Sequence, residues 1–472
     1  MMKKQAFNPY LPSWEYIPDG EPYVFGDRVY VYGSHDAFNG PAFCVGDYMC
    51  WSAPVDDLAD WRCEGVIYPR MADPLNADGH MCLYAPDVTL GADGKYYLYY
   101  VLDKVSVVSV AVCDSPAGRY RFLGYVRYAD GTLLGQRAGD EPQFDPGVLL
   151  EGDRVYLYTG FAGKGDKTRH GSMVTVLADD MLTIVEPPRL VVPGVEYADG
   201  TGFEGHAFFE ASSIRKRGDT YYFVYSSTPM HELCYATSKS PTEGFRYGGV
   251  IVSNCDLHID SYKPADMPAA YGGNNHGSIV EIKGEWYIFY HRHTNGTWFS
   301  RQGCAEPIRF LPDGSIPQVE ITSCGLNGKP LAGAGEYPAY IACNLFTAEP
   351  HMLAGVPGMP KVMQDGRDGD PETGYIGCIV DTTTIGFKYF DCSGVKRIGI
   401  RARGYSDGTV DIKAAWDGPV LATIRLHYTS VWETYWADVA FPDGKQALYL
   451  TYHGENLAHA YGALSLQSIL FE

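Results

Sequence analysis

The chain has 472 residues, more than one ordinary domain needs, so we expect at least two domains. Its 57 acidic and 37 basic residues leave a net charge of −20, which argues against nucleic acid or an anionic membrane as a partner and is compatible with a neutral substrate. Aromatic residues make up 14% of the chain, which suits Tyr-rich strands and sugar-facing surfaces.

Five similar segments follow one another, each with a short polar element before an alternating aromatic and aliphatic run. They read IPDGEPYVFGDRVYVYGSHD, LYAPDVTLGADGKYYLYYVLD, QFDPGVLLEGDRVYLYTGF, FFEASSIRKRGDTYYFVYSS and NNHGSIVEIKGEWYIFYHRH. A Gly-Asp, Asp-Gly or Lys-Gly pair precedes each run, which is a hairpin signal. Short strands that recur at intervals of about 58 to 68 residues are typical of a propeller with one blade per repeat. We therefore predict an all-β, five-bladed β-propeller.

One polar residue occupies a similar place in each repeat. These residues are Asp19, Asp87, Asp145, Glu210 and His276. The innermost strand of a propeller blade starts at the central axis, so we expect these side chains to converge there. Four carboxylates without matching cations are costly, because like charges raise one another's pKa. The pattern indicates a functional site. The alternative, that each acid only starts a hairpin, has most weight for Asp87 in APDV.

Glu210 has a setting typical of a general acid. It follows two Phe and precedes Ala-Ser-Ser, and a carboxyl among apolar neighbours favours its neutral form. A nearby carboxylate such as Asp145 shifts it further the same way. Glycoside hydrolysis needs one protonated carboxyl and one ionised carboxylate. Asp19, between Pro and Gly, is the candidate for the ionised group that activates water.

Residues 8 to about 320 resemble glycoside hydrolase family 43, the five-bladed propellers that remove arabinose or xylose from plant polysaccharides. The resemblance rests on NPYLPSWEYIPDGEP, YAPDV, FDPGV, FFEASSI and NNHGSIVE, in that order. The NDPNG and RDP signatures of the invertase-like propellers are absent from the sequence.

The resemblance implies a role for each axial residue. It implies Asp19 as general base, Asp145 as the acid that tunes pKa and orients substrate, and Glu210 as general acid. His276 matches a histidine near the axis that is associated with a bound calcium ion, although a hydrogen-bonding role has equal weight. Family members invert configuration, so the carboxyls of Asp19 and Glu210 are expected roughly 6.5–9.5 Å apart. The family's usual opening Asp-Pro is Asp19-Gly20 in this chain.

Further residues are candidates for substrate contact because they lie near blade starts or in loops. The predicted contacts are Trp51, Asp87, Phe144, Phe209, Trp298 and Arg301. Arg301 is favoured for a polar contact to the sugar. Each aromatic residue has a core position as its alternative. His35 and His206 are further candidates, with structural roles as their alternative.

The character of the sequence changes after the repeats. We predict a catalytic propeller over residues 1–324, a Gly-, Ala- and Pro-rich linker or crossover over 325–345, and a β-sandwich over 346–472. The last region resembles family 6 carbohydrate-binding modules in its strand framework, especially in WDGPVLATIRLHYTSVWETYWADVAFPDGKQALYLTYHGE. The Asn expected before the last strand of a sugar-binding member is not evident in GALSLQSILFE. The module therefore either binds glycans or braces the propeller.

Two functions compete. The first is an exo-acting, inverting glycosidase that releases α-L-arabinofuranose or β-D-xylose from plant-derived oligosaccharides. The second is a catalytically silent carbohydrate-binding propeller, whose acids only bond to sugar hydroxyls. The complete set of three acids favours the enzyme. Neither an apolar signal region nor a run of 18 apolar residues is visible, and the twelve Cys are scattered, so we predict a cytoplasmic protein with buried thiols.

Overall fold

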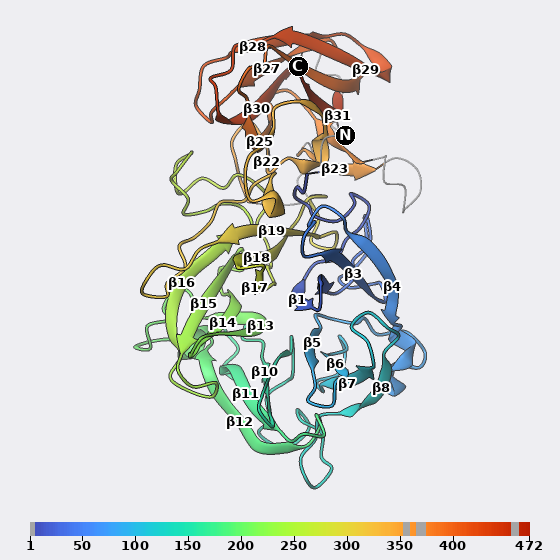
Figure 1. Cartoon of the computed structure of the whole chain (residues 1–472), viewed down its shortest axis with the longest axis vertical. Helices are drawn as coiled ribbons and strands as arrows, with labels where there is room; N and C mark the ends of the chain where they lie inside the picture. The colour runs from blue at the N-terminus through green and yellow to red at the C-terminus, as the bar shows by residue number, and fades with distance from the viewer. Residues whose placement is uncertain (1–4, 353–358, 365–373, 455–461) are drawn as a thin grey trace.

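The computed structural model describes residues 5–352, 359–364, 374–454 and 462–472. Five sheets surround a common centre, and two larger sheets form a separate C-terminal unit (Figure 1). Helix in the described ranges is limited to short 3-10 turns: η1 (Arg70–Ala72), η2 (Pro74–Asn76), η3 (Val195–Tyr197), η4 (Gly325–Asn327) and η5 (Ala339–Ile341). None of the described helices is long and apolar enough to cross a membrane.

The five sheets are the blades of the propeller, and neighbouring strands within each blade are antiparallel. Blade I contains β1 (Glu21–Phe25), β2 (Arg28–Tyr32), β3 (Tyr48–Pro54) and β4 (Arg62–Tyr68). Blade II contains β5 (Asp87–Leu90), β6 (Tyr96–Tyr100), β7 (Ser109–Cys113) and β8 (Arg121–Tyr125). Blade III contains β9 (Gly147–Glu151), β10 (Arg154–Thr159), β11 (Gly171–Leu177) and β12 (Ile184–Pro193). Blade IV contains β13 (Phe208–Arg217), β14 (Thr220–Ser227), β15 (Glu232–Ser238) and β16 (Arg246–Ser253). Blade V contains β17 (Ile279–Ile282), β18 (Glu285–Arg292) and β19 (Gln302–Ile308).

Gly-Asp pairs make the tight turn between the first two strands of three blades. In blades I, III and IV, two residues separate the strands, and the first of them is Gly26, Gly152 or Gly218. Each of these glycines has φ between 61° and 64°, a region that other residues adopt at a cost. The hairpin signals in the sequence thus correspond to hairpins in the structure.

Both faces of the inner strands are buried, because each blade packs against two neighbours. In β14, Tyr221 and Phe223 belong to the apolar cluster shared with blade III, whereas Tyr222 and Val224 belong to the cluster shared with blade V. The other pairs of adjacent blades share apolar clusters in the same way. A strand with period-two side chains buried on both faces needs aromatic residues on both, which explains the Tyr-rich runs.

The ring closes between the first and last blades. A parallel bridge joins Gly20 to Gly277, so the segments that enter β1 and β17 lie side by side. The strands β5 and β9 are also in contact, as are β9 and β13. The chain entering each inner strand therefore meets its counterparts at the centre of the propeller.

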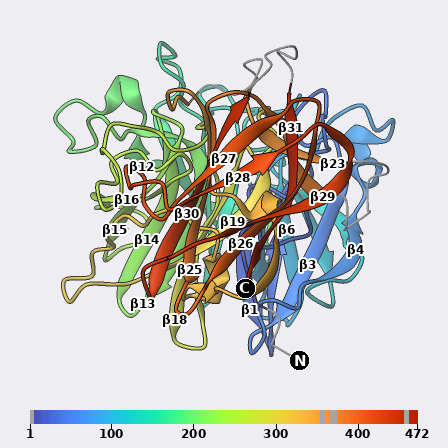
Figure 2. The same cartoon turned by 90° about the horizontal axis from the view of Figure 1, so that it is seen from above.

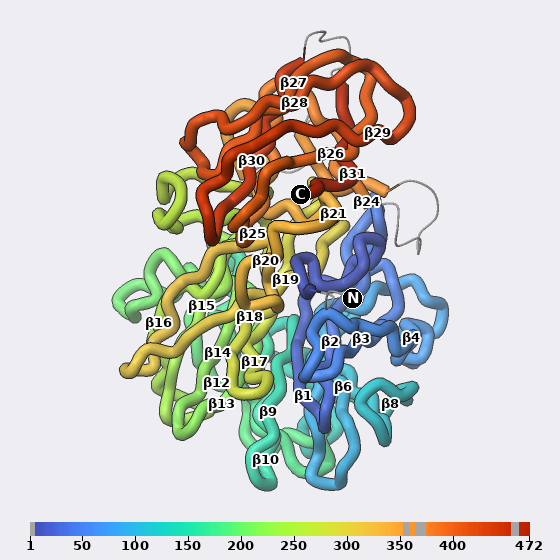
Figure 3. The backbone as a smooth tube through the Cα atoms, turned by 45° about the horizontal axis from the view of Figure 1, so that its top comes forward, coloured from blue at the N-terminus to red at the C-terminus, as the bar shows by residue number. Residues whose placement is uncertain are grey.

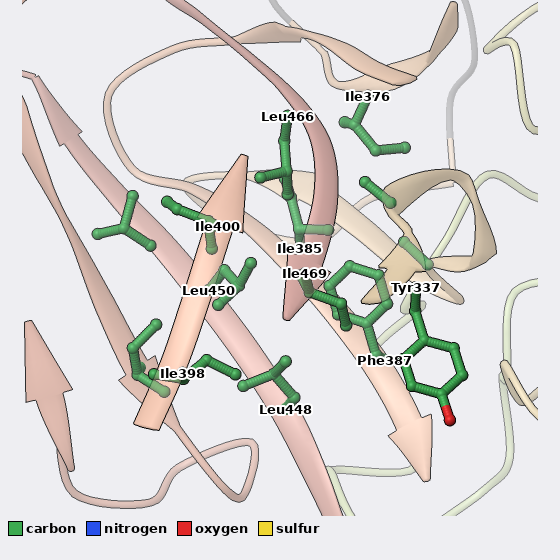
Figure 4. Close-up of a cluster of buried hydrophobic side chains, with 14 of the residues drawn as sticks. Tyr337, Ile376, Ile385, Phe387, Ile398, Ile400, Leu448, Leu450, Leu466 and Ile469 are labelled. Atoms are coloured by element: carbon green, nitrogen blue, oxygen red, sulfur yellow. The ribbon is translucent and has the colours of Figure 1, made fainter. Parts of the chain in front are cut away.

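The C-terminal unit consists of two sheets that share one core. One sheet has the order β20 (Leu331–Ala332), β25 (Thr383–Asp391), β30 (Lys445–Gly454), β27 (Gly408–Lys413) and β28 (Ala422–Leu426), with β22 (Asn344–Thr347) also paired to β25. The other has the order β23 (Lys361–Gln364), β24 (Gly374–Ile379), β31 (Leu464–Phe471), β26 (Arg397–Gly404) and β29 (Thr429–Asp438), with β21 (Gly335–Pro338) paired to β31. Figure 4 shows Phe387 and Leu450 of the first sheet beside Ile400 and Ile469 of the second.

The segment 325–345, predicted as a linker or crossover, is part of the C-terminal unit. Its short strands β20, β21 and the start of β22 pair with β25 and β31, because its Leu and Tyr residues enter the same core. The N-terminal segment joins them: Gln5 Nε2 donates to the hydroxyl of Tyr337 at 2.7 Å, and Gln5 Oε1 accepts from the backbone N–H of Ala332 at 2.9 Å. The two ends of the propeller thus meet beside the C-terminal unit (Figures 1 and 3).

A buried ion pair connects the C-terminal unit to the propeller. Lys388 Nζ of β25 lies 2.9 Å from Asp256 Oδ2, and the side chains of both residues are fully buried. The ammonium also lies 3.4 Å from the centre of the Tyr262 ring. Figure 2, the view from above, shows the C-terminal strands lying across the propeller.

Candidate active site

A cavity of about 680 Å³ lies where the five blades meet. Residues just before or within the inner strands line it, so every blade contributes to its wall. The charged and titratable residues that line it include Asp19, Asp145, Glu210, His276 and Arg301. The three predicted catalytic acids and the predicted metal-site histidine therefore face one cavity.

A break in the pairing of β13 directs Glu210 into the cavity. The register between β13 and β14 shifts around Glu210, and Ala211 has φ of 67°. Phe208 packs into the core between blades III and IV, but Phe209 and Glu210 both line the cavity. Such a bulge interrupts strict alternation and re-aims a side chain. The freed N–H of Ala211 donates to Asp145 Oδ2 at 3.0 Å, which links the two acids across adjacent blades.

Asp19 is held by groups from blades I and V. Its Oδ1 accepts from Arg301 Nη1 at 2.9 Å, and its other oxygen accepts from the hydroxyl of Ser34. Its backbone N–H donates to His291 Nδ1 at 3.3 Å. Asp19 has φ of 57°, a left-handed conformation that only surrounding contacts make persistent. The carboxylate is thus fixed in position.

The electrostatics of this surrounding keep Asp19 ionised. Burial favours the neutral acid, but the charge of Arg301 and the contact with His291 hold the pKa of Asp19 below its usual value. Arg301 is itself fixed by Asp36, which accepts from its Nε at 2.8 Å and its Nη2 at 3.0 Å. One buried cation therefore lies between two carboxylates.

The surroundings of Glu210, in contrast, favour its neutral, protonated form. Burial, followed by the nearby charge of Asp145, raises the pKa of Glu210 to about 8. Burial also raises the pKa of Asp145, and the neighbouring His276 opposes that rise. The cavity thus presents an ionised carboxylate at Asp19 and a protonated carboxyl at Glu210 near neutral pH.

His276 lies between two acids. Its Nδ1 is 3.5 Å from Asp145 Oδ2, and its Nε2 is 3.7 Å from Glu21 Oε1. Although burial opposes the charge, the contacts with Asp145 and Glu21 raise the pKa of His276 well above its usual value. Both the Nε2 of His276 and the Oε1 of Glu21 are buried without a hydrogen-bond partner.

Aromatic side chains line much of the cavity. Phe144, Phe209 and Trp298, all predicted substrate contacts, line it together with Tyr84 and Phe161. Tyr84 contacts Phe144 with ring centres 5.4 Å apart, Phe144 contacts Phe161 at 5.4 Å, and Phe161 contacts Phe209 at 5.0 Å. This continuous apolar surface suits the carbon-rich face of a sugar ring.

Two predicted substrate contacts lie outside the cavity. Trp51 is 4% exposed and packs in the core between blades I and V, where its Nε1 donates to Glu15 Oε2 at 2.9 Å. Both faces of β3 are buried, and the Trp51 side chain lies on the face that packs against blade V. The prediction of substrate contact at Trp51 is wrong for this reason.

Asp87 lies two positions further along the chain than the residue that lines the cavity in its blade. Asp19 and Asp145 each lie two residues before their strands, but Asp87 is the first residue of β5, and Ala85 takes the cavity-lining place. Asp87 instead accepts from the hydroxyl of Tyr23 and the N–H of Val148, both at 2.7 Å. Burial and the nearby Glu21 raise its pKa to about 7. Its predicted substrate contact is therefore also wrong.

Comparison with known proteins identifies the family. The model of "Glycosyl hydrolases family 43" matches residues 17–316, which span all five blades. The chain belongs to glycosyl hydrolase family 43.

Curated and structural relatives agree with this assignment to family 43. A xylosidase/arabinosidase of Thermoclostridium stercorarium is 67% identical over 463 residues, covering 97% of this chain and 98% of that protein. The crystal structure of CoXyl43, a family 43 β-xylosidase/α-arabinofuranosidase from a compost microbial metagenome in complex with xylotriose, has a TM-score of 0.50 and 26% identity, covering 66% of this chain and 96% of that one. An arabinoxylan arabinofuranohydrolase from Bacillus subtilis, in complex with cellotetraose, shares the fold along 98% of this chain and 97% of its own, with a TM-score of 0.53 and 20% identity.

Several residues of this family 43 site were not predicted. Asp36, which fixes Arg301, stands directly after the candidate His35 in YGSHD, and His291 begins the HRH that ends the fifth repeat. Asp36 follows β2 and His291 lies near the end of β18, so the place where each aromatic run ends is the signal that could have found them. His35 itself lies away from the cavity and contacts Glu15 Oε1 at 3.0 Å.

Proposed function

We propose that this family 43 enzyme is an exo-acting, inverting glycoside hydrolase that releases α-L-arabinofuranose or β-D-xylose from plant-derived oligosaccharides. The observation that carries the proposal is that two carboxyls with opposite pKa shifts, Asp19 and Glu210, line one cavity. Asp19 is kept ionised by Arg301, and Glu210 is kept protonated by burial and Asp145. A catalytically silent binding propeller needs no such pair, and the relatives give it no support.

Each acid has a distinct step. Glu210 donates its proton to the departing glycosidic oxygen, while Asp19 accepts a proton from the water that attacks the anomeric carbon. Asp145 raises the pKa of Glu210 and, through Ala211, fixes the bulge that carries it. Inversion requires the carboxyls of Asp19 and Glu210 to stand roughly 6.5–9.5 Å apart, with the water between Asp19 and the sugar.

The substrate class rests on the relatives and the cavity. The Thermoclostridium stercorarium relative carries the name xylosidase/arabinosidase, and the CoXyl43 structure holds xylotriose. A cavity of about 680 Å³ with aromatic walls falls within the size range of small-ligand sites and suits one sugar with its leaving group. Arg301 lines this cavity, but its Nε, Nη1 and Nη2 all donate to carboxylates, so its main proposed role is to hold Asp19.

The test combines a substrate panel with product stereochemistry. Purified protein is assayed on aryl α-L-arabinofuranosides, β-D-xylosides and aryl hexosides, and the first anomer released from xylobiose is followed by proton NMR. We expect pentose release with α-xylose appearing first, abolished in Asp19→Asn. Failure to cleave any pentoside would overturn the activity, and β-xylose as the first product would overturn inversion alone.

We also propose that a calcium ion binds beside His276. When two ligand atoms each lie 2.3–2.6 Å from one Ca²⁺ ion, they are about 3.5 Å from each other. His276 Nε2 and Glu21 Oε1 are 3.7 Å apart, and both are buried without a hydrogen-bond partner. Water would supply the remaining oxygen ligands. The positive charge of a bound ion would then act on Asp145 in the way that the charge of a protonated His276 does without the ion. One of the solved relatives is described as a calcium-free form.

The C-terminal unit is proposed to be a β-sandwich of the carbohydrate-binding-module type that braces the propeller. Its two sheets with a shared core support the sandwich, and Lys388 and Gln5 support the bracing role. Trp416 packs against Phe346 and Tyr262 at the junction with the propeller, which also supports the bracing role. All twelve cysteines are unpaired, which supports a reducing compartment such as the cytoplasm.

A further inference from the structure

Blade IV carries a cluster of metal-ligating side chains outside the catalytic cavity. His206 precedes β13, and Glu232 and Cys234 are alternate residues of β15, so their side chains project from the same face of that strand. Glu232 and Cys234 are fully buried, whereas 32% of the His206 side chain is exposed. The cluster therefore has one side open to solvent and two ligands inside the blade.

Three atoms of this cluster surround one point. His206 Nδ1 is 2.6 Å from Glu232 Oε1, Glu232 Oε1 is 3.4 Å from Cys234 Sγ, and Cys234 Sγ is 4.0 Å from His206 Nδ1. A triangle with these sides has a point about 2.0 Å from all three corners, and points slightly out of its plane lie at 2.1–2.3 Å. Zinc bonds to His nitrogen and carboxylate oxygen at about 2.0–2.2 Å and to Cys sulfur at about 2.3 Å. All three atoms therefore lie within bonding reach of one ion, and the 2.6 Å between His206 Nδ1 and Glu232 Oε1 must widen to give tetrahedral angles.

We propose that His206, Glu232 and Cys234 bind one Zn²⁺ ion, with water as the fourth ligand on the exposed side. The ligand types are those zinc takes in proteins, and a thiolate with a carboxylate neutralises the charge of the ion. Ser227 Oγ donates to Glu232 Oε1 at 2.5 Å, and the His206 ring stacks on Tyr247 with centres 4.9 Å apart. These contacts orient the carboxylate and the imidazole, as outer-shell partners of metal ligands do.

Binding exchanges protons for the ion. Without metal, burial raises the pKa of the Cys234 thiol, and the hydrogen bond that Glu232 accepts from His206 raises the pKa of the imidazole. When Zn²⁺ binds, the Cys234 thiol loses its proton and Nδ1 of His206 gives up its N–H, so that the Zn–S and Zn–N bonds can form. Affinity should therefore rise with pH, because the Cys234 thiol must release its proton to bind the ion.

A second group shares Glu232. The ligand atoms of His231, Glu232 and His258 also lie within 4.8 Å of one another. This group lacks a thiolate, His258 is exposed, and His231 Nδ1 already bonds to Ser253 Oγ at 2.9 Å. The group containing Cys234 is therefore the better site, and His258 provides a control that separates the two.

The test uses cobalt as a spectroscopic substitute for zinc in untagged, full-length protein stripped with a chelator. We expect one equivalent of Co²⁺ to give a sulfur-to-cobalt charge-transfer band in the near ultraviolet, together with intense tetrahedral bands in the visible, and Zn²⁺ to bleach both. Cys234→Ser should lose the charge-transfer band. His206→Gln, a change at a partly exposed site, should weaken binding by more than the roughly 10–100-fold that outer-shell changes cost.

Two variants act as controls, and circular dichroism of each metal-free variant verifies folding. Cys63→Ser removes an exposed thiol on β4, and His258→Gln removes a ligand of the second group. Both should keep the charge-transfer band and the stoichiometry of one ion per chain. The proposal is overturned if the wild type shows no stoichiometric band, if folded Cys234→Ser keeps it, or if His258→Gln abolishes binding while His206→Gln does not.

Discussion

Arg301 Nη1 contacts Asp19 Oδ1 at 2.9 Å across 282 residues of sequence, where the last blade meets the first. The same guanidinium bonds to Asp36 through its other nitrogens, so its position does not depend on substrate. Together with His291, His276 and the hydroxyl of Ser34, this contact outweighs the effect of burial and holds the pKa of Asp19 below its usual value. The closure of the propeller therefore sets the protonation state of the proposed base.

Removal of Arg301 should move the acidic limb of the pH profile. A neighbouring opposite charge lowers a carboxyl pKa by about 1–3 units, so the double variant Arg301→Met/Asp36→Asn should shift the acidic limb of kcat/KM upward by a similar amount. The second substitution avoids leaving Asp36 charged and unpaired. Arg169→Met is the control, because Arg169 lines the same cavity but pairs with Asp166. An unshifted acidic limb in the double variant would contradict the role of Arg301.

Glu210→Gln should separate substrates by their leaving groups. The variant keeps the shape of the side chain and removes the proton, and general acid assistance is worth about 10²–10⁴-fold. We expect that loss for xylobiose or an alkyl pentoside and a much smaller one for a dinitrophenyl pentoside, which departs without a proton. Asp19→Asn should slow both substrates alike, because water must be activated whatever leaves. Equal slowing of both substrates by Glu210→Gln would rule out the general-acid role.

The pH dependence follows from the same two acids. The form of the enzyme with Asp19 ionised and Glu210 protonated exists between their pKa values. Activity should therefore decline above pH of about 8, as Glu210 loses its proton, and at acidic pH below the ordinary pKa of Asp. The measurement is kcat/KM for an alkyl pentoside from acid to alkaline pH. The alkaline limb should disappear in Glu210→Gln, and its persistence would assign that limb to another group.

The sequence repeat predicted the propeller well because the blades bury both faces of their inner strands. Tyr221 to Val224 alternate between two interblade cores, and such a pattern is visible as an aromatic run that follows a Gly-Asp turn. The axial position of Glu210 was predictable for the same reason. Asp87 was misplaced because a two-residue offset within a repeat keeps the side chain on the same face of the strand but moves it along the axis.

Contacts between distant segments were beyond the reach of sequence patterns. Asp36 lies 265 residues from Arg301, and nothing local marks the two as partners. The segment 325–345 was read as a linker from its Gly, Ala and Pro content, but its strands pair with β25 and β31, which come later in the chain. Pairing with remote strands can organise a segment whose composition alone suggests a loop.

Removal of calcium should reduce stability through His276. A ligand that binds only the folded state adds about 2.7 kcal/mol when present at a hundred times its Kd. We expect a chelator to lower the melting temperature of the wild type and calcium, added in excess, to restore it. His276→Gln and Glu21→Gln should each reduce this response. A wild type whose activity and melting temperature are both unaffected by chelation would contradict the proposed site.

Lys388→Met should weaken the attachment of the C-terminal unit to the propeller. The ammonium of Lys388 is fully buried against Asp256 and lies 3.2 Å from Glu320 Oε2, so its loss removes the cation that pairs with both carboxylates. Breaking a buried pair by removing one partner costs about 3–5 kcal/mol. Lys388→Met/Asp256→Asn should recover part of that loss, because one of the two carboxylates that lost their partner is then neutral.

Lys445→Met is the control. The ammonium of Lys445 lies over the Tyr389 ring on the exposed side of the same junction, and its removal should cost at most about 1 kcal/mol. Urea unfolding measures these free energies, and calorimetry shows whether the wild type's two units unfold together while those of Lys388→Met separate. If Lys388→Met and Lys445→Met cost the same, the buried pair does not hold the two units together.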